Sequence, residues 1–439
     1  MGDEHEATDR LATRIDEKLP SFSTVSLPMC FKVPNLLRQT NEKAYEPQII
    51  SIGPYHHGKD HLKGMEAHKM FYLNRLLQRR GETGVRKYVM ALKDKEEKIR
   101  KCYAEPLIHN IDGDALVEMM LLDGCFIIEI IRKYQTWNCG ELRERNDNFP
   151  NFNVVSIACD LLLVENQLPF FVLSELFHMT REPNQENVHG FILTALDFFS
   201  RVMPGCGNGI EPPFVISDQI TKYLLGLVLD SWVPSAEARL NYNQSSEEYG
   251  GWNFKRSAIE LREAGIKFKK MDNEKSFFDI KFENGVLWIP TIEMYDYTDS
   301  ILRNFIAHEQ SHNKHPRYVT DYVTFMDCLI NTRNDVELLR QSGIIVNGLG
   351  DDEDVATIFN GLCDSIVFSN ENFYSEIINN VEKYSGSKWN LWMENLKHNY
   401  FNTPWALISF LAAVSLLILT VVQTIYSLLS YYNTVKLFS

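Results

Sequence analysis

The feature that most constrains this chain is an uncharged, apolar run near its C-terminal end, over residues 404–429. As a helix, this run would span about 39 Å, whereas the hydrocarbon core of a bilayer is about 30 Å thick. Trp405 lies at its start and Tyr426 near its end, as in the aromatic belts of membrane proteins. The run therefore predicts a transmembrane helix, preceded by a juxtamembrane segment at 386–403 and followed by a short tail at 430–439.

The N-terminal residues 1–25 are polar and acidic, and they lack the apolar core of a signal peptide. We expect them to form a mobile arm or a loosely docked helix. A single span near the C-terminal end, without a signal peptide, favours a tail-anchored, single-pass topology. Lys388 and Lys397 precede the span and Lys436 alone follows it, which favours a cytosolic main domain. The identity of the membrane stays open.

The charge balance limits the kinds of partner. The chain has 439 residues with 44 Lys and Arg against 58 Asp and Glu, which gives a net charge of −14. This balance argues against a nucleic-acid binder, which needs a basic face. The eight cysteines show no Cys-x-x-Cys spacing of the kind that zinc ribbons use. We expect no cofactor, and we expect two kinds of partner, a membrane and an unidentified protein.

Two apolar blocks, at 115–134 and 157–177, are each long enough to be considered as membrane spans. Each block carries internal carboxylates, and a carboxylate at the middle of a bilayer costs at least about 2.5–3.5 kcal/mol. We therefore expect both blocks to form buried helices of a soluble core. Pro169 should kink or divide the second block, because proline removes a helical hydrogen bond.

The rest of the chain predicts a mainly α fold with a small antiparallel β-sheet, which is an α+β class. A large soluble domain is expected at 26–385, with a polar linker near 234–252. Asn284-Gly285 between alternating runs predicts a β-hairpin near 277–290, and the β-branched run at 49–52 has strand character. Further helices are expected at 64–80, 84–103, 187–203, 213–232, 257–264, 298–313, 318–332, 334–342 and 354–365.

One stretch matches a metalloprotease pattern. His308, Glu309 and His312 follow the H-E-x-x-H spacing, which on a helix lets two histidines bind zinc and a glutamate act as general base. A metal-dependent hydrolase is therefore the alternative function. Against it, His315 stands where the longer metzincin pattern requires glycine. Phe305 shares a helical stripe with both histidines, so the pair is equally consistent with a packed helix end.

A second cluster of interest contains Tyr55, His56, His57, Glu66 and His68. Histidines at this density form either a metal site or a set of hydrogen bonds in a turn and at a helix start. We favour the second interpretation.

Two carboxylates in the apolar blocks, Asp123 and Glu165, have the chemistry of a glycosidase pair. Nothing in the sequence fixes their separation. A buried capping or ion-pair role is the alternative, and we favour it.

The stretch at 33–69, VPNLLRQTNEKAYEPQIISIGPYHHGKDHLKGMEAHK, resembles the opening signature of the plant domain-of-unknown-function 247 family. The blocks DGCF at 123–126, LLLVENQLPF at 161–170 and the segment 304–310 are also similar, and the resemblance covers roughly 30–425. The family normally has an aromatic or other apolar residue near His308. The resemblance therefore implies that the zinc pattern is accidental.

The same resemblance implies single-pass plant membrane proteins with no established enzymatic activity, some grass members of which are linked to pollen self-incompatibility. We therefore expect a membrane-anchored, non-enzymatic interaction or signalling protein. If the histidine cluster binds a partner, Tyr55, His56 and His57 are the first residues to test.

Overall fold

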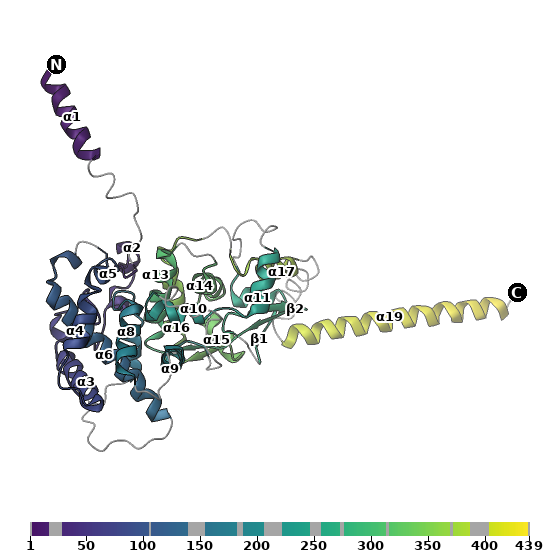
Figure 1. The fold of residues 1–439 in the computed structure, drawn as a ribbon. Helices are drawn as coiled ribbons and strands as arrows, with labels where there is room; N and C mark the ends of the chain where they lie inside the picture. The colour runs from purple at the N-terminus through teal and green to yellow at the C-terminus, as the bar shows by residue number, and fades with distance from the viewer. Residues whose placement is uncertain are drawn as a thin grey trace. The chain divides into compact units, whose positions relative to one another are not determined.

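The protein was analysed as a computed structural model (Figure 1), which describes residues 2–16, 29–104, 107–138, 154–181, 188–205, 222–245, 256–272, 276–312, 316–368, 372–386 and 404–437. The chain divides into two compact units that interleave along the sequence. Unit 1 comprises residues 1–233, 295–315 and 364–367. Unit 2 comprises residues 234–294, 316–363 and 368–439.

Unit 1 is built around helix α6, Gly113–Asn138. Its residues from 116 to 131 are all buried except Glu118, which confirms that this apolar block is a core helix. A side chain at Gly124 would collide with Leu176, so this glycine lets a neighbouring helix approach α6 closely. The helices that pack against α6 are α3 (Gly64–Arg80), α4 (Arg86–Lys93), α5 (Glu96–Arg100), α8 (Phe170–Thr180) and α9 (Val188–Ser200).

The second apolar block is divided as expected. Helix α7, Val154–Leu161, ends before a buried irregular segment, and α8 begins directly after Pro169. The predicted helix at 64–80 is confirmed in full as α3. The helix expected at 84–103 is instead two short helices, α4 and α5, which are separated at residues 94–95.

Unit 1 also contains several short helices and residues 295–315, which follow the first part of unit 2 in the sequence. Helix α13, Thr298–Ser311, packs against η2, Glu42–Tyr45, and against α10, Leu224–Ser231. The part of the expected 213–232 helix that precedes residue 222 lies outside the described residues. The remaining short helices are α2 (Asn35–Arg38), η3 (Asp60–Leu62) and η4 (Leu107–Asn110).

Unit 2 contains two small sheets. The strands β2, Lys281–Glu283, and β3, Val286–Ile289, form the predicted antiparallel hairpin. Asn284 and Gly285 make its turn with φ of 52° and 75°, the left-handed values that this dipeptide favours.

The pairing differs from a purely antiparallel sheet. The strand β1, Lys267–Lys270, adds to β3 in parallel. A second parallel pair joins β4, Ile292–Met294, to β5, Ile345–Asn347.

Three of the helices of unit 2 pack against these strands. Helix α12, Ala258–Glu263, begins with a capping box between Ser257 and Glu260. Helix α11, Ala236–Ser245, occupies most of the segment that we expected to be a linker, so residues 236–245 are helical and that expectation was wrong for them. The other helices are α14 (Tyr318–Leu329), α15 (Arg333–Gln341), α16 (Asp352–Leu362) and α17 (Ser375–Ser385).

Two further helices lie at the two ends of the chain. Helix α1, Gly2–Asp16, is polar. Helix α19, Pro404–Leu437, contains a 20-residue stretch, Ile408–Ser427, that is long and apolar enough to cross a membrane. The expectation of one such helix near the C-terminal end is confirmed, and the helix continues beyond residue 429.

Candidate functional site

The expected strand at 49–52 is wrong, because the backbone there pairs with side chains and not with another strand. The carboxylate of Asp160 accepts hydrogen bonds from the N–H groups of residues 48–50 at 2.7–2.9 Å. Asn166 accepts from the N–H of Ile52 at 2.6 Å and donates to the carbonyl of Ile50 at 3.0 Å. Burial raises the pKa of Asp160 to about 6, and the three N–H donors act in the opposite direction. These side chains hold an extended segment in place without a sheet.

Lys69 on α3 anchors the same segment from its other side. Its ammonium group, which is fully buried, lies 2.6 Å from Asp123 and donates to Glu66 and to the carbonyl of Ser51, both at 2.7 Å. Asp123 also accepts from the N–H of Gly53 at 2.8 Å. Burial lowers the pKa of Lys69, but the two carboxylates outweigh it and the net shift is upward. Lys69 therefore stays charged, and Glu66 serves as its partner.

His56 lies in a compact cluster of four charged side chains. Its ring nitrogens are 3.4 Å from Glu46 and 3.5 Å from Glu165. Arg38 bridges the two carboxylates at 2.8 and 2.6 Å, and Lys59 pairs with Glu46. Burial, followed by the charge of Lys59, lowers the pKa of His56 to about 4, although Glu46 opposes the shift. The cluster therefore has no net charge at neutral pH, because two cations and two anions surround a neutral imidazole.

The other residues of this predicted site have separate roles. The hydroxyl of Tyr55 donates to the carbonyl of Cys30 at 2.8 Å and accepts from the N–H of Ala104 at 3.1 Å. His57 is exposed and His68 is half-buried. Among the described residues, no group of three or more His, Cys, Asp or Glu side chains is placed to hold a metal ion.

The proposed carboxylate pair also has two distinct environments. Asp123 contacts Lys69 as described, whereas Glu165 accepts from the N–H of Val33 at 2.8 Å and pairs with Arg38. Both carboxylates thus make the buried ion pairs and hydrogen bonds that we favoured from the sequence.

The H-E-x-x-H stretch lies in the last turns of α13 and at its C-cap. The rings of His308 and His312 stack 4.3 Å apart with an interplanar angle of 19°. His312 Nδ1 is 3.0 Å from the carbonyl of His308, and Tyr223 meets the His308 ring edge-on at 5.5 Å. The pair belongs to a packed aromatic cluster that also includes Phe31, 5.6 Å from His312. Zinc binding by these residues stays a prediction.

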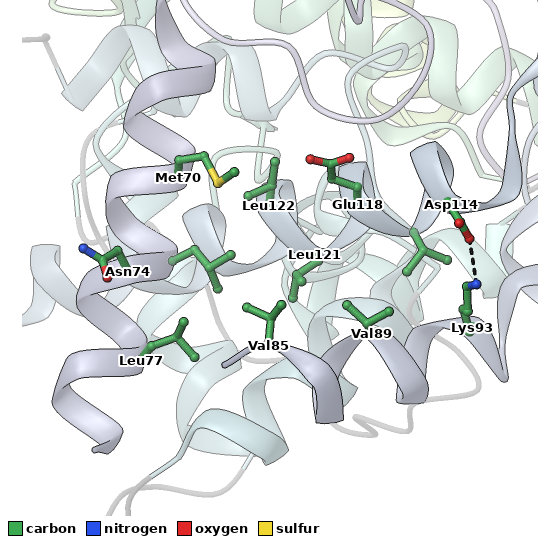
Figure 2. A pocket seen from close by; sticks show the side chains of 12 residues that line it. Met70, Asn74, Leu77, Val85, Val89, Lys93, Asp114, Glu118, Leu121 and Leu122 are labelled. Atoms are coloured by element: carbon green, nitrogen blue, oxygen red, sulfur yellow. Dashed lines mark ion pairs between the residues drawn. The ribbon is translucent and has the colours of Figure 1, made fainter. Parts of the chain in front are cut away.

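A feature that sequence reasoning missed is an open apolar groove of about 510 Å³ between α3, α4 and α6 (Figure 2). Lys93 of α4 and Asp114 of α6 form an ion pair of 2.7 Å at one end, and Glu118 lies on the rim. Eight of its lining side chains are apolar, namely Met70, Leu73, Leu77, Val85, Val89, Val117, Leu121 and Leu122. The sequence predicts helices at 64–80 and 84–103 and a buried helix at 115–134, but it could not show that these helices leave a gap between them.

Comparison with known proteins identifies the lineage. A profile of the DUF247 family, described as a plant protein of unknown function, matches residues 30–419. The chain belongs to this family. The DUF247 match contains the anchored segment, the groove and the first half of α19, and it confirms the resemblance seen in the sequence.

Two curated relatives of this DUF247 chain come from Arabidopsis thaliana. UPF0481 protein At3g47200 is 30% identical over 430 residues, covering 92% of this chain and 87% of the relative. Putative UPF0481 protein At3g02645 is 24% identical over 492 residues, covering 91% and 89%. No solved structure matches the chain.

Proposed function

We propose that this chain is a membrane-anchored plant protein that acts by binding another protein and not by catalysing a reaction. The observation that carries the proposal is α19. Its apolar side chains are exposed all round, with Leu416, Leu417 and Leu419 each more than 60% exposed. Apolar surface in water costs roughly 25 cal/mol per Å², and a bilayer would remove that cost along the whole Ile408–Ser427 stretch.

The groove supports the binding part of the proposal. The buried ionisable residues Lys69, Asp123 and Glu165 are engaged in contacts that hold the fold, so their chemistry is structural. The groove, in contrast, presents apolar side chains on an open surface of unit 1. Apolar clefts with a few polar groups at the rim are the usual form of a binding site. We place the main domain in the cytosol, on the basis of the lysines that flank the span.

Extraction of microsomes tests the anchor. The full chain should stay in the pellet after alkaline carbonate and high salt, and it should dissolve only with detergent. A variant that lacks residues 404–437 should be released by carbonate. Release of the full chain by carbonate would contradict the anchor.

Protease treatment of sealed microsomes tests the orientation. We expect the main domain to be digested without detergent, since it would face the cytosol. A large fragment protected until detergent is added would contradict the cytosolic placement.

A further inference from the structure

We infer that the groove between α3, α4 and α6 binds one face of a cationic amphipathic helix from a partner protein. The inference rests on the proposed function, because it names the partner's chemistry for the same groove. Its shape is the first argument. Figure 2 shows α3 and α4 as walls and α6 behind them. A groove lined by helices accepts a helix that inserts apolar side chains at i, i+3, i+4 and i+7.

The lining suits such an occupant. The volume of about 510 Å³ holds several apolar side chains but not a whole helix, so only one face would enter. Met70, on the rim, is 52% exposed. Methionine adapts its shape to different apolar partners, and it is common on surfaces that bind helices.

The charged residues on the rim of the groove favour a partner helix with positive charge. Lys93 is compensated by Asp114, whereas Glu118 is exposed and makes no ion pair within the described part of the chain. The groove therefore presents one uncompensated negative charge beside apolar surface. A Lys or Arg placed next to the apolar stripe of an incoming helix would pair with Glu118. The net charge of −14 on the whole chain would attract the same partner over longer distances.

Two other occupants fit less well. An anionic phospholipid would bring its headgroup phosphate towards Glu118, and the two charges would repel. Helix α1 of this chain has five acidic residues against Arg10 and Arg14, so it too has the unfavourable sign.

A charge-swap experiment tests the inference on the full chain in nanodiscs of zwitterionic lipid. The probe is a fluorescent peptide of about 18 residues with leucine on one helical stripe and lysine beside it, and its match has glutamate in place of lysine. We expect the lysine peptide to bind at least about tenfold more tightly than the glutamate peptide. Glu118→Lys should reverse this preference, and Val89→Glu should abolish both interactions.

Glu42→Lys is the matched control, because Glu42 is an exposed acid outside the groove lining and the substitution changes the net charge equally. Glu42→Lys should leave the binding of both peptides unchanged. Empty nanodiscs are a second control, and they should bind neither peptide above background. Equal losses in Glu42→Lys and Glu118→Lys would overturn the inference in favour of non-specific attraction. An unchanged preference in Glu118→Lys would overturn it as well. A third result would also overturn the inference: the peptides bind more tightly after residues 2–16 are removed, and Glu118→Lys has no effect. That result would assign the groove to α1.

The membrane anchor and the groove are tested independently. Glu118→Lys should remain as resistant to carbonate as the unchanged chain, and circular dichroism should show the same helix content. If the unchanged chain resists carbonate but shows no preference for the lysine peptide, the groove alone would be refuted. Release by carbonate together with selective peptide binding would refute the anchor alone.

Discussion

At the scale of single residues, the charges of unit 1 hold the segment 33–69 onto the helical core. Lys69 illustrates the principle, because a fully buried ammonium has all of its protons engaged by Ser51, Glu66 and Asp123. A buried ion pair contributes little net free energy relative to an apolar pair of the same shape. Removing one partner, however, leaves the other charge buried and uncompensated.

Lys69→Met should therefore destabilise the protein by about 3–5 kcal/mol, because Asp123 would lose its cation in a site that is 1% exposed. Adding Asp123→Asn should recover part of the loss, since the amide is neutral and still accepts from Gly53. Unfolding in urea, followed by tryptophan fluorescence, measures both. Equal stability of Lys69→Met and the unchanged chain would contradict the buried ion pair.

His56 predicts a pH dependence. Its pKa is lowered from 6.5 to about 4 in the folded protein, so the unfolded chain binds the extra proton between these values. The contribution of His56 to the free energy of unfolding is fully present above pH 6.5. It is lost as the pH falls towards 4, by roughly 3 kcal/mol in all. His56→Gln should flatten this part of the stability profile, measured by thermal unfolding at pH 7 and pH 4.5. Parallel profiles for the two proteins would argue against a neutral, buried His56.

The residues of the histidine cluster could be selected from the sequence, but their roles could not be assigned. Sequence spacing shows that Tyr55, His56 and Glu66 are close along the chain. Glu165, one of the two carboxylates beside His56, and Asp123, which contacts Lys69 and Gly53, lie more than fifty residues from these contacts along the chain, and only the folded chain brings them together. For the same reason, a large separation in the sequence, the hydrogen bonds between Asp160 and residues 48–50 could not be predicted.

At the scale of elements, periodicity was reliable where one apolar face packs on a core. Helix α3 and the hairpin of β2 and β3 follow directly from their patterns. The prediction failed at 49–52, where a β-branched run pairs with side chains. It also failed at 236–245, where polar composition suggested a linker but the chain forms α11.

Comparing Gly285 in the hairpin turn with Gly265 separates the cost of backbone strain from the cost of a steric collision. Gly285 has φ of 75°, and an added Cβ would collide with the Tyr384 hydroxyl, whereas Gly265 has φ of 92° and open space around it. Gly265→Ala should cost about 1–2 kcal/mol through backbone strain alone. Gly285→Ala should cost more, and Tyr384→Ala in the same chain should remove the excess. Thermal melting measures all three, and equal costs at the two glycines would argue against the Tyr384 contact.

At the scale of the whole molecule, unit 1 depends on a helix encoded far from the rest of it. Asn304 of α13 is fully buried, accepts from the N–H of Val164 at 2.9 Å and donates to the carbonyl of Ala44 at 2.8 Å. Ser300 donates to the same carbonyl. The sequence predicted α13 as a helix but gave no indication of which segments it would contact, because that depends on the path of the intervening chain.

A chain that ends at Val233 should therefore be incompletely folded. We expect trypsin to digest it at least about tenfold faster than the same region of the full chain, because the partners of α13 would be exposed. Addition of a synthetic peptide with residues 295–312 should restore resistance, and the Asn304→Ala peptide should not. Resistance of the shortened chain by itself would show that unit 1 does not need α13.

The return of α13 to unit 1 also has a consequence for synthesis of the protein on the ribosome. Domains usually fold as they emerge, but the last helix of unit 1 is translated only after residues 234–297 have been made. At about 5–20 residues per second, that stretch takes roughly 3–13 s. During this interval the nascent unit exposes the surface that α13 later covers, and a chaperone that binds nascent chains would find its target there.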